Sequence, residues 1–183
     1  MSLQRKFSKR RQLFILKHAQ LPDPRLGRPR RACQNTPMIA AAHPHPPELH
    51  YLIEHQVWAR VHDDGTATVG ITALGIRLSG EIYMCRPKSV GVEVEQGRAI
   101  AVVELAKSIV AVKSPVSGTV VAINPLLADR PEWVHEDPYG QGWIARVALR
   151  DLATDQALLV HGQAVAPAMA AHARLFRQDL ERP

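Results

Sequence analysis

The sequence predicts a small all-β barrel or sandwich followed by a C-terminal helix. Short runs rich in β-branched and aromatic residues recur at close spacing between residues 51 and 148, and turn signals separate them. Residues 151–182 have a helical composition instead. The chain of 183 residues is long enough for one domain with a real core, plus tails.

The β elements follow one another from residue 51. A strand region at 51–61, the turn signal at 62–65 and a return strand at 66–72 come first. One or two helical turns are expected at residues 73–78. The remaining expected elements are a strand at 80–85, a turn at 86–91, a lead-in at 92–97, strands at 100–103 and 119–123, a short helical or irregular stretch from Asn124, and a last strand at 142–148.

A lysine lies between two of these strands. The β-branched runs 100–103 and 119–123 flank a short polar centre that contains Lys107. We interpret them as a hairpin that exposes the Lys107 amine at its tip on a rigid support. Such an amine suits the covalent attachment of a group carrier. The alternative is that Lys107 is one more solvated lysine.

The segment after the last strand is predicted to be helical. Residues 151–159 have a helical composition, and within 164–180 a stripe recurs at roughly helical spacing: Val165, Met169, His172, Leu175 and Phe176. We expect this C-terminal helix to pack on the barrel and the stripe to belong to the core.

The first 47 residues differ from the rest in charge. They hold ten Lys and Arg and one acid, Asp23, a net of +9, whereas the whole chain carries +6, so the remainder carries −3. Their prolines and missing apolar periodicity predict disorder. The basic charge therefore belongs to the tail and does not indicate a nucleic-acid binder. We expect the tail to be a transit peptide, an arm for a nucleic acid or an acidic partner, or, as we favour, an upstream stretch before a true start at Met38.

We accordingly divide the chain into a basic, Pro-rich tail at 1–47, a β domain at 48–150, which is the candidate carrier domain, and a helical extension at 151–183. Only Cys33 and Cys85 occur and there is no C-x-x-C, which favours a reduced compartment. No segment approaches the apolar length of a membrane span. No spacing among the histidines fits a zinc site, so no metal is expected; those considered are His43, His45, His50, His55 and His62.

Catalytic side chains are not evident either. Glu136 and Asp137 are adjacent within one predicted loop, which is not an acid–base couple across a cleft. No Gly-rich phosphate loop and no Ser/His/Asp arrangement stands out. We therefore expect no catalytic residue in this chain.

Six motifs, in order, resemble the H-protein family of the glycine cleavage system, the lipoyl carriers of that complex. The resemblance spans about residues 51–147. The motifs are Gly70-Ile-Thr72, Gly80-Glu-Ile82, Val103-Glu104-x-x-Lys107, Pro115-Val-Ser-Gly118, Asn124 and Glu136-Asp-Pro-Tyr-Gly-Gln-Gly-Trp143. The last octet is the most specific, and the spacing from Lys107 to Gly118 is that of the family.

The resemblance implies a barrel-sandwich hybrid with C-terminal helices and lipoate amide-linked to Lys107. Glu104 and Gly118 match positions that lipoate ligases are thought to read, because an acid can orient an amine and a glycine allows close approach. Each also has a plain structural interpretation, Glu104 as a solvated strand acid and Gly118 as a turn residue.

The same resemblance implies a carrier subunit rather than an enzyme, with an aminomethyl group and electrons carried on lipoyl-Lys107. The implied partners are a lipoate ligase or lipoyl transferase, glycine decarboxylase, aminomethyltransferase and dihydrolipoamide dehydrogenase. We expect a monomer without nucleic-acid or membrane partners. It would be cytoplasmic, or in the mitochondrial matrix if the basic N-terminus is a transit peptide.

Two alanines depart from the family pattern. Ala73 and Ala111 stand where the family has acids, and such acids are expected contacts for a cationic amine intermediate. Lipoylation is therefore better supported than glycine cleavage as such. The alternatives are an H-like lipoate-binding protein that carries sulfur intermediates for a heterodisulfide-reductase-like complex, and an unmodified adaptor with the same fold.

Overall fold

The computed structural model describes the backbone of residues 45–180 and the side chains of residues 45–175. The prediction of a disordered tail at 1–47 falls, except for its last three residues, outside this part of the chain. Elements below are therefore those of the described residues.

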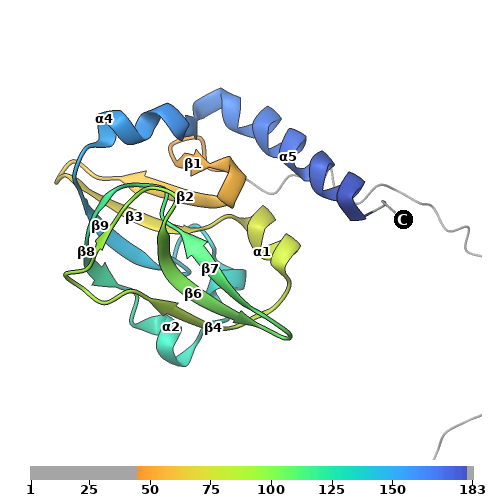
Figure 1. Ribbon diagram of the computed structural model, residues 1–183, viewed down its shortest axis with the longest axis horizontal. Helices are drawn as coiled ribbons and strands as arrows, with labels where there is room; N and C mark the ends of the chain where they lie inside the picture. The colour runs from red at the N-terminus through yellow and green to blue at the C-terminus, as the bar shows by residue number, and fades with distance from the viewer. Residues whose placement is uncertain (1–44, 181–183) are drawn as a thin grey trace, which may run out of the picture. The chain divides into compact units, whose positions relative to one another are not determined.

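Two antiparallel sheets make up most of the described fold (Figure 1). The larger sheet has the strand order β10-β1-β2-β3-β9-β8-β5, and the smaller has the order β4-β6-β7. In chain order, the strands of the larger sheet are β1 (His50–Leu52), β2 (Val57–Val61), β3 (Thr66–Ile71), β5 (Glu93–Val94), β8 (Gly118–Ile123), β9 (Ala145–Leu149) and β10 (Val160–His161). Those of the smaller sheet are β4 (Ile82–Pro87), β6 (Ala99–Leu105) and β7 (Ile109–Lys113). The prediction of a β-dominated fold is confirmed, with two sheets in place of a closed barrel.

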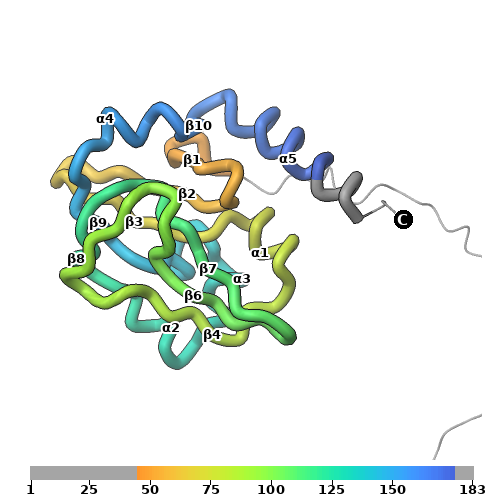
Figure 2. The backbone as a smooth tube through the Cα atoms, in the orientation of Figure 1, coloured from red at the N-terminus to blue at the C-terminus, as the bar shows by residue number. Residues whose placement is uncertain are grey.

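Helical segments lie in the connections and at the C-terminal end. The α-helices are α1 (Ala73–Ser79), α2 (Leu126–Asp129), α3 (Trp133–Glu136), α4 (Leu152–Asp155) and α5 (Val165–Leu180). Single 3-10 turns are η1 (Ile53–His55), η2 (Gln156–Leu158) and η3 (Gly162–Ala164). The tube in Figure 2 shows α5 leaving β10 and running past the β1 side of the larger sheet. The predicted C-terminal helix is thus present.

A left-handed residue divides the first predicted strand region into β1 and β2. Gln56 has φ +53° and follows η1, so the chain turns there before β2 begins. Its buried side-chain oxygen accepts a hydrogen bond from Thr72 Oγ1 (2.7 Å). Thr72 in turn caps α1 by accepting from the Gly75 amide (2.9 Å). Gln56 therefore joins the start of the larger sheet to the helix that follows β3.

The apolar core has two parts. One lies between the sheets and takes buried residues from both, among them Val69, Ile100, Val103, Val120 and Val147. The other lies against α5 and contains Leu49, Tyr51, Trp58, Leu74, Val165 and Met169. The expected helical stripe is only partly correct, because Leu175 is 60% exposed. The side chain of Phe176 lies outside the described residues.

The predicted hairpin partner was wrong. β6 pairs with β7, whereas residues 118–123 form β8, which pairs with β9 and β5 in the other sheet. The run that begins at Ile109 is itself apolar and returns directly from the turn. Ser114 and Pro115 then end β7, since proline has no amide hydrogen to extend a ladder, and the chain crosses to the larger sheet.

Candidate functional site

Lys107 lies at the tip of the β6–β7 hairpin, which extends away from the body of the fold (Figure 1). The Leu105 amide donates a hydrogen bond to the Ser108 carbonyl oxygen (2.9 Å), and this closes a loop whose two central residues are Ala106 and Lys107. Both central residues are exposed. Within residues 45–175, no ion pair involves the Lys107 ammonium. The amine is therefore presented to solvent on a hydrogen-bonded support.

Glu104 shares this end of the hairpin. It is exposed on β6, the central strand of the smaller sheet, where its Cα partners are Met84 on β4 and Ile109 on β7. Because side chains alternate along a strand, Glu104 lies on the outer face with Val102, opposite the buried Val103. A protein that approaches the tip from the outer face would meet this carboxylate.

Gly118 lies elsewhere, at the start of β8 in the larger sheet. It is buried and pairs with Leu149 on β9 and with Val94 on β5. A Cβ atom at this position would overlap the carbonyl oxygen of Ala148. The close approach of β8 and β9 therefore requires glycine at this position, whether or not a ligase also recognises it. The fold brings Lys107 and Glu104 together and puts Gly118 beyond the base of the hairpin.

A buried carboxylate holds the segment that precedes Gly118. Asp155 is 3% exposed, and it accepts hydrogen bonds from the Ser117 amide (2.6 Å) and hydroxyl (2.8 Å). The Gln96 side-chain amide donates to the carbonyl oxygens of Pro115 and Asp155. These bonds tie α4 to the chain between β7 and β8. Asp155 was not predicted as a site residue, because no local sequence pattern marks an acid whose partner lies 38 residues away.

The Glu136–Trp143 motif forms a packed loop. The Trp58 indole donates to the carbonyl oxygen of Pro138 (3.1 Å), and the Asn124 side-chain amide donates to those of Gln141 and Trp143 (2.7 Å each). Cβ atoms at its two glycines would overlap the Asp137 carboxylate and the Trp133 carbonyl oxygen. The most specific motif of the sequence therefore builds the frame rather than the reactive group.

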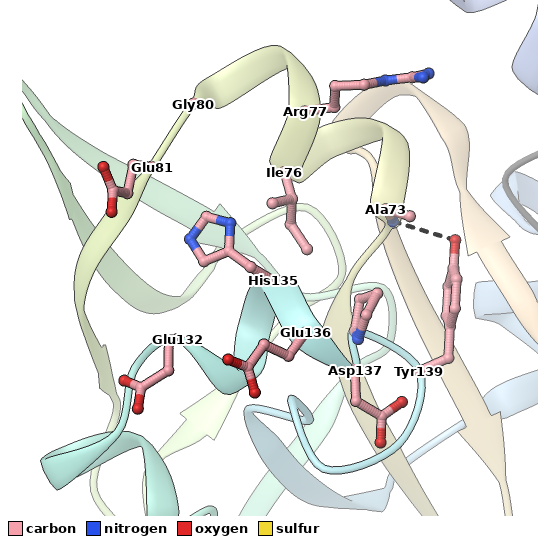
Figure 3. Close-up of a pocket in the computed structure, with 11 residues that line it drawn as sticks. Ala73, Ile76, Arg77, Gly80, Glu81, Glu132, His135, Glu136, Asp137 and Tyr139 are labelled. Carbon is pink, nitrogen blue, oxygen red and sulfur yellow. Dashed lines mark hydrogen bonds between the residues drawn. The ribbon is translucent and has the colours of Figure 1, made fainter. Parts of the chain in front are cut away.

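A pocket of about 800 Å³ lies between α1 and the α3 region (Figure 3). Its apolar lining includes Ala73 and Ile76, and Figure 3 shows His135 between α1 and Glu81. Glu81 precedes β4, whose first residue, Ile82, pairs with Leu105 at the end of β6. The pocket is thus beside the strands that support the Lys107 tip.

Hydrogen bonds already engage several polar groups of this pocket. His135 Nε2 accepts a hydrogen bond from the Ile82 amide (2.9 Å). The Glu132 carboxylate pairs with Arg130 (2.9 Å), and the hydrogen bond from Arg130 lowers the pKa of Glu132. The Tyr139 hydroxyl accepts from the Ala73 amide (3.2 Å), and burial raises the pKa of Tyr139. Ala73 itself offers no acid to the pocket. The second departure, Ala111, is exposed on β7.

Three further observations bear on the chemistry. Between residues 45 and 175, no group of three or more His, Cys, Asp and Glu side chains is arranged to hold a metal ion. The described helices include none with the length and hydropathy to span a bilayer. Cys85 is 4% exposed, and burial raises the pKa of its thiol to about 12, so it is protonated at neutral pH and poorly nucleophilic.

Comparisons with known proteins agree with the geometry. Residues 49–172 match the family model "Glycine cleavage H-protein". The chain is 42% identical to glycine cleavage system H protein 2 of Aquifex aeolicus over 118 residues, which cover 64% of this chain and 73% of the relative. It is 43% identical to the glycine cleavage system H protein of Psychrobacter cryohalolentis over 114 residues, 62% of this chain and 90% of the relative.

A solved structure is similar as well. The crystal structure of a glycine cleavage system H protein from Mycobacterium marinum superposes with a TM-score of 0.57 at 26% identity. The match covers 67% of this chain and 97% of that chain. The sequence and fold comparisons therefore point to one family.

Proposed function

The chain belongs to the glycine cleavage H-protein family, and from that premise we propose that it is a lipoyl carrier with lipoate amide-linked to Lys107. The observation that carries the proposal is the exposed Lys107 amine at the tip of a protruding, hydrogen-bonded hairpin. The motif match from sequence, which is confirmed at the level of the family, supports the same residue.

The residues around Lys107 suit attachment of a large group. Its neighbours in the loop, Ala106 and Ser108, are small and exposed, so an attached arm has room to move. When bound, lipoate supplies a disulfide that takes up electrons and a carried group and is later regenerated by oxidation of its dithiol. The hairpin keeps the attachment point rigid, and tethering maintains a high effective concentration at successive partners. The chain itself then acts as a carrier subunit and needs no catalytic base.

Attachment requires that a lipoate ligase or lipoyl transferase recognise the unmodified chain. We propose Glu104 as a contact for that enzyme, since its carboxylate is exposed at the same end of the hairpin as the amine. Gly118 is proposed for the same role on the family pattern alone. Its burial against Ala148 makes that role an indirect one, through the position of β8.

We propose that the arm carries an aminomethyl group and electrons. The partners would be glycine decarboxylase, aminomethyltransferase and dihydrolipoamide dehydrogenase. The relatives named above are glycine cleavage system H proteins, which supports this cargo. Those comparisons give no support to the sulfur-carrier and unmodified-adaptor alternatives. Ala73 and Ala111 still distinguish this chain from the family pattern, so contacts to a cationic cargo must come from other groups.

Intact-mass measurement tests the proposal. The full chain, purified from its native host, is expected to carry the lipoyl mass increment, and peptide mapping is expected to place it on Lys107. Lys107→Arg keeps the positive charge but lacks the acylable amine, so the increment should disappear while the folded state persists. An unmodified wild-type chain in a host that lipoylates its other carriers would overturn the proposal.

A further inference from the structure

The strand that follows Lys107 is an apolar edge strand. β7 is the last strand of the smaller sheet and pairs only with β6 among the described residues. Its first three residues are exposed, Ile109 by 72% and Val110 by 41%, with Ala111 next to them. An exposed apolar edge beside the functional lysine needs a physical explanation.

Soluble proteins usually protect such an edge. Charged side chains, prolines and bulges prevent an exposed strand from pairing with another chain. Residues 109–112, the four residues of β7 nearest the tip, include no charged residue and no proline. The register shift of the β6–β7 pair lies between Ala99 and Ala101, at the opposite end of the hairpin. The edge beside Lys107 is therefore left open for strand addition.

The register shows which backbone groups face the open edge. Leu105 and Ser108 are bonded to each other across the turn, and bonded and non-bonded pairs alternate along an antiparallel ladder. The next pair, Glu104 with Ile109, is therefore non-bonded, as is Val102 with Ala111. The N–H and C=O groups of Ile109 and Ala111 consequently point away from β6.

The other side of β6 gives an independent check. The Lys88 amide donates to the Ile100 carbonyl oxygen (2.8 Å), which starts the β4–β6 ladder. Alternation from that bond makes Val102 and Glu104 the β6 residues that bond to β4. The β6–β7 register independently leaves Val102 and Glu104 without bonds to β7, so the hydrogen-bond patterns on the two sides of β6 agree.

The position of this edge favours one partner, on the basis of the proposed function. An enzyme that acylates Lys107 must bring its active site to the amine of the unmodified chain. It must therefore contact the hairpin itself. Ile109 is only two residues from Lys107, at most about 7 Å along the chain. Enzymes that act at the far end of an attached arm have no such need to contact β7.

We propose that the free edge of β7 is a strand-addition site for the lipoate-attaching enzyme. An extended apolar segment of that enzyme pairs with the outward backbone groups of Ile109 and Ala111, and the Ile109 side chain fills a pocket on it. The Lys107 amine is thereby held at the enzyme's active site. There it forms an amide with the carboxyl carbon of lipoyl adenylate, releasing AMP and the amine proton.

Proline at residue 111 tests the edge directly. Ala111→Pro removes one outward N–H and leaves the β6 ladder intact, since edge strands accept proline where the amide faces solvent. The matched control is Glu93→Pro on β5. Glu93 is also exposed at a sheet edge. The Val120 amide donates to the Val92 carbonyl oxygen (3.0 Å), and alternation from that bond turns the Glu93 amide away from β8. The full unmodified chain is incubated with purified lipoate ligase, lipoate and ATP, and intact mass gives the rate.

We expect Ala111→Pro to lower kcat/KM for lipoylation by at least about fivefold, mainly through KM, as loss of one strand hydrogen bond implies. Glu93→Pro should be lipoylated like the wild type. Equal rates for the two proline variants would overturn the strand-addition proposal while leaving the carrier function standing. A wild-type chain that this ligase does not modify at all would instead count against the proposed function.

Hydrogen exchange tests the edge without a substitution and does not depend on the folding of a variant. With a non-hydrolysable lipoyl adenylate analogue and the ligase, the amides of Ile109 and Ala111 should gain protection in the wild-type chain. Unchanged exchange at both amides in a saturated complex would refute the proposal. So would protection that grows with the concentration of the chain alone, because it would identify a second copy as the occupant.

Discussion

The tip around Lys107 and the start of β8 at Gly118 lie eleven residues apart in sequence, yet they differ in solvent exposure and in packing. Lys107 is exposed in a two-residue loop, and no described ion pair holds it. Gly118 is buried between two strands with no room for a Cβ atom. The family motif therefore contains both an exposed lysine and a glycine whose position leaves no room for a larger side chain.

The same contrast extends along the neighbouring strands. Ile109 on β7 is 72% exposed, whereas Val120 on β8 is fully buried in the core between the sheets. The outer end of the hairpin contributes little apolar burial, while β8 lies between β9 and β5 and contributes to the core. We infer that substitutions near the tip change recognition, and those near β8 change stability.

Gly118→Ala is expected to have the largest effect on folding. The added methyl group overlaps the Ala148 carbonyl oxygen, so β8 and β9 must separate, and the free energy of unfolding should fall by about 3–4 kcal/mol. Urea denaturation followed by circular dichroism measures it. Lys107→Ala is the control and should stay within about 0.5 kcal/mol of the wild type. Similar losses for the two variants would remove the distinction between tip and frame.

Val120→Ala should have the next largest effect. Truncation of this fully buried side chain leaves a cavity between the sheets, and the free energy of unfolding should fall by about 2 kcal/mol. Ile109→Ala removes more atoms, but from an exposed position, so its change should be below about 0.5 kcal/mol. If Ile109→Ala proved the more destabilising of the pair, β7 would be covered in solution and would not be an open edge.

Asp155→Asn should cost about 1–2 kcal/mol in the free energy of unfolding. The amide keeps one oxygen acceptor, but its nitrogen cannot accept from Ser117, whose amide and hydroxyl both bond to the carboxylate. Thermal unfolding measures the loss. Asp129→Asn, at an exposed residue of α2, serves as the control and should have no measurable effect. A neutral result for Asp155→Asn would mean that α4 is not needed to hold the Ser117 segment.

Acidification should have the smallest effect and should spare the hairpin. His50 on β1 stacks on His161 of β10, with ring centroids 4.9 Å apart, and burial followed by the charge of His161 lowers the His50 pKa below 6.5. Between that lowered pKa and 6.5 the unfolded chain binds the proton more readily, so the free energy of unfolding falls as the pH drops through this window. Residues 99–113 have no histidine to add to this loss.

Denaturation at several pH values between 7 and 5 measures that slope. His50→Asn should flatten it, since the asparagine does not titrate. Hydrogen exchange should show that β1 and β10 lose protection before β6 does. An unchanged slope in His50→Asn would assign the pH dependence to other groups.

The local elements followed from the sequence because their causes are local. Alternating β-branched runs and turn residues predict β2, β3, β4 and β6, and helical turns were expected where α1 lies. The exposure of Lys107 also follows from a polar turn between two apolar strands. Which strands share a sheet could not be predicted from local sequence in the same way. Residues 119–123 are rich in β-branched residues, as β7 is, and the break at Pro115 separates the two runs, which lie in different sheets.

The sequence by itself determined the strand-rich domain, the helical C-terminal segment, the family and the lysine that the motif marks, because periodicity and motif spacing are properties of neighbouring residues. Tertiary structure alone decided that Gly118 is a packing residue against Ala148, that Asp155 bonds to Ser117, and that Leu175 is exposed. It also decided that Ile109 and Ala111 turn their backbone groups to an open edge. Each of these depends on a contact with a strand or helix distant in sequence, which no local pattern specifies.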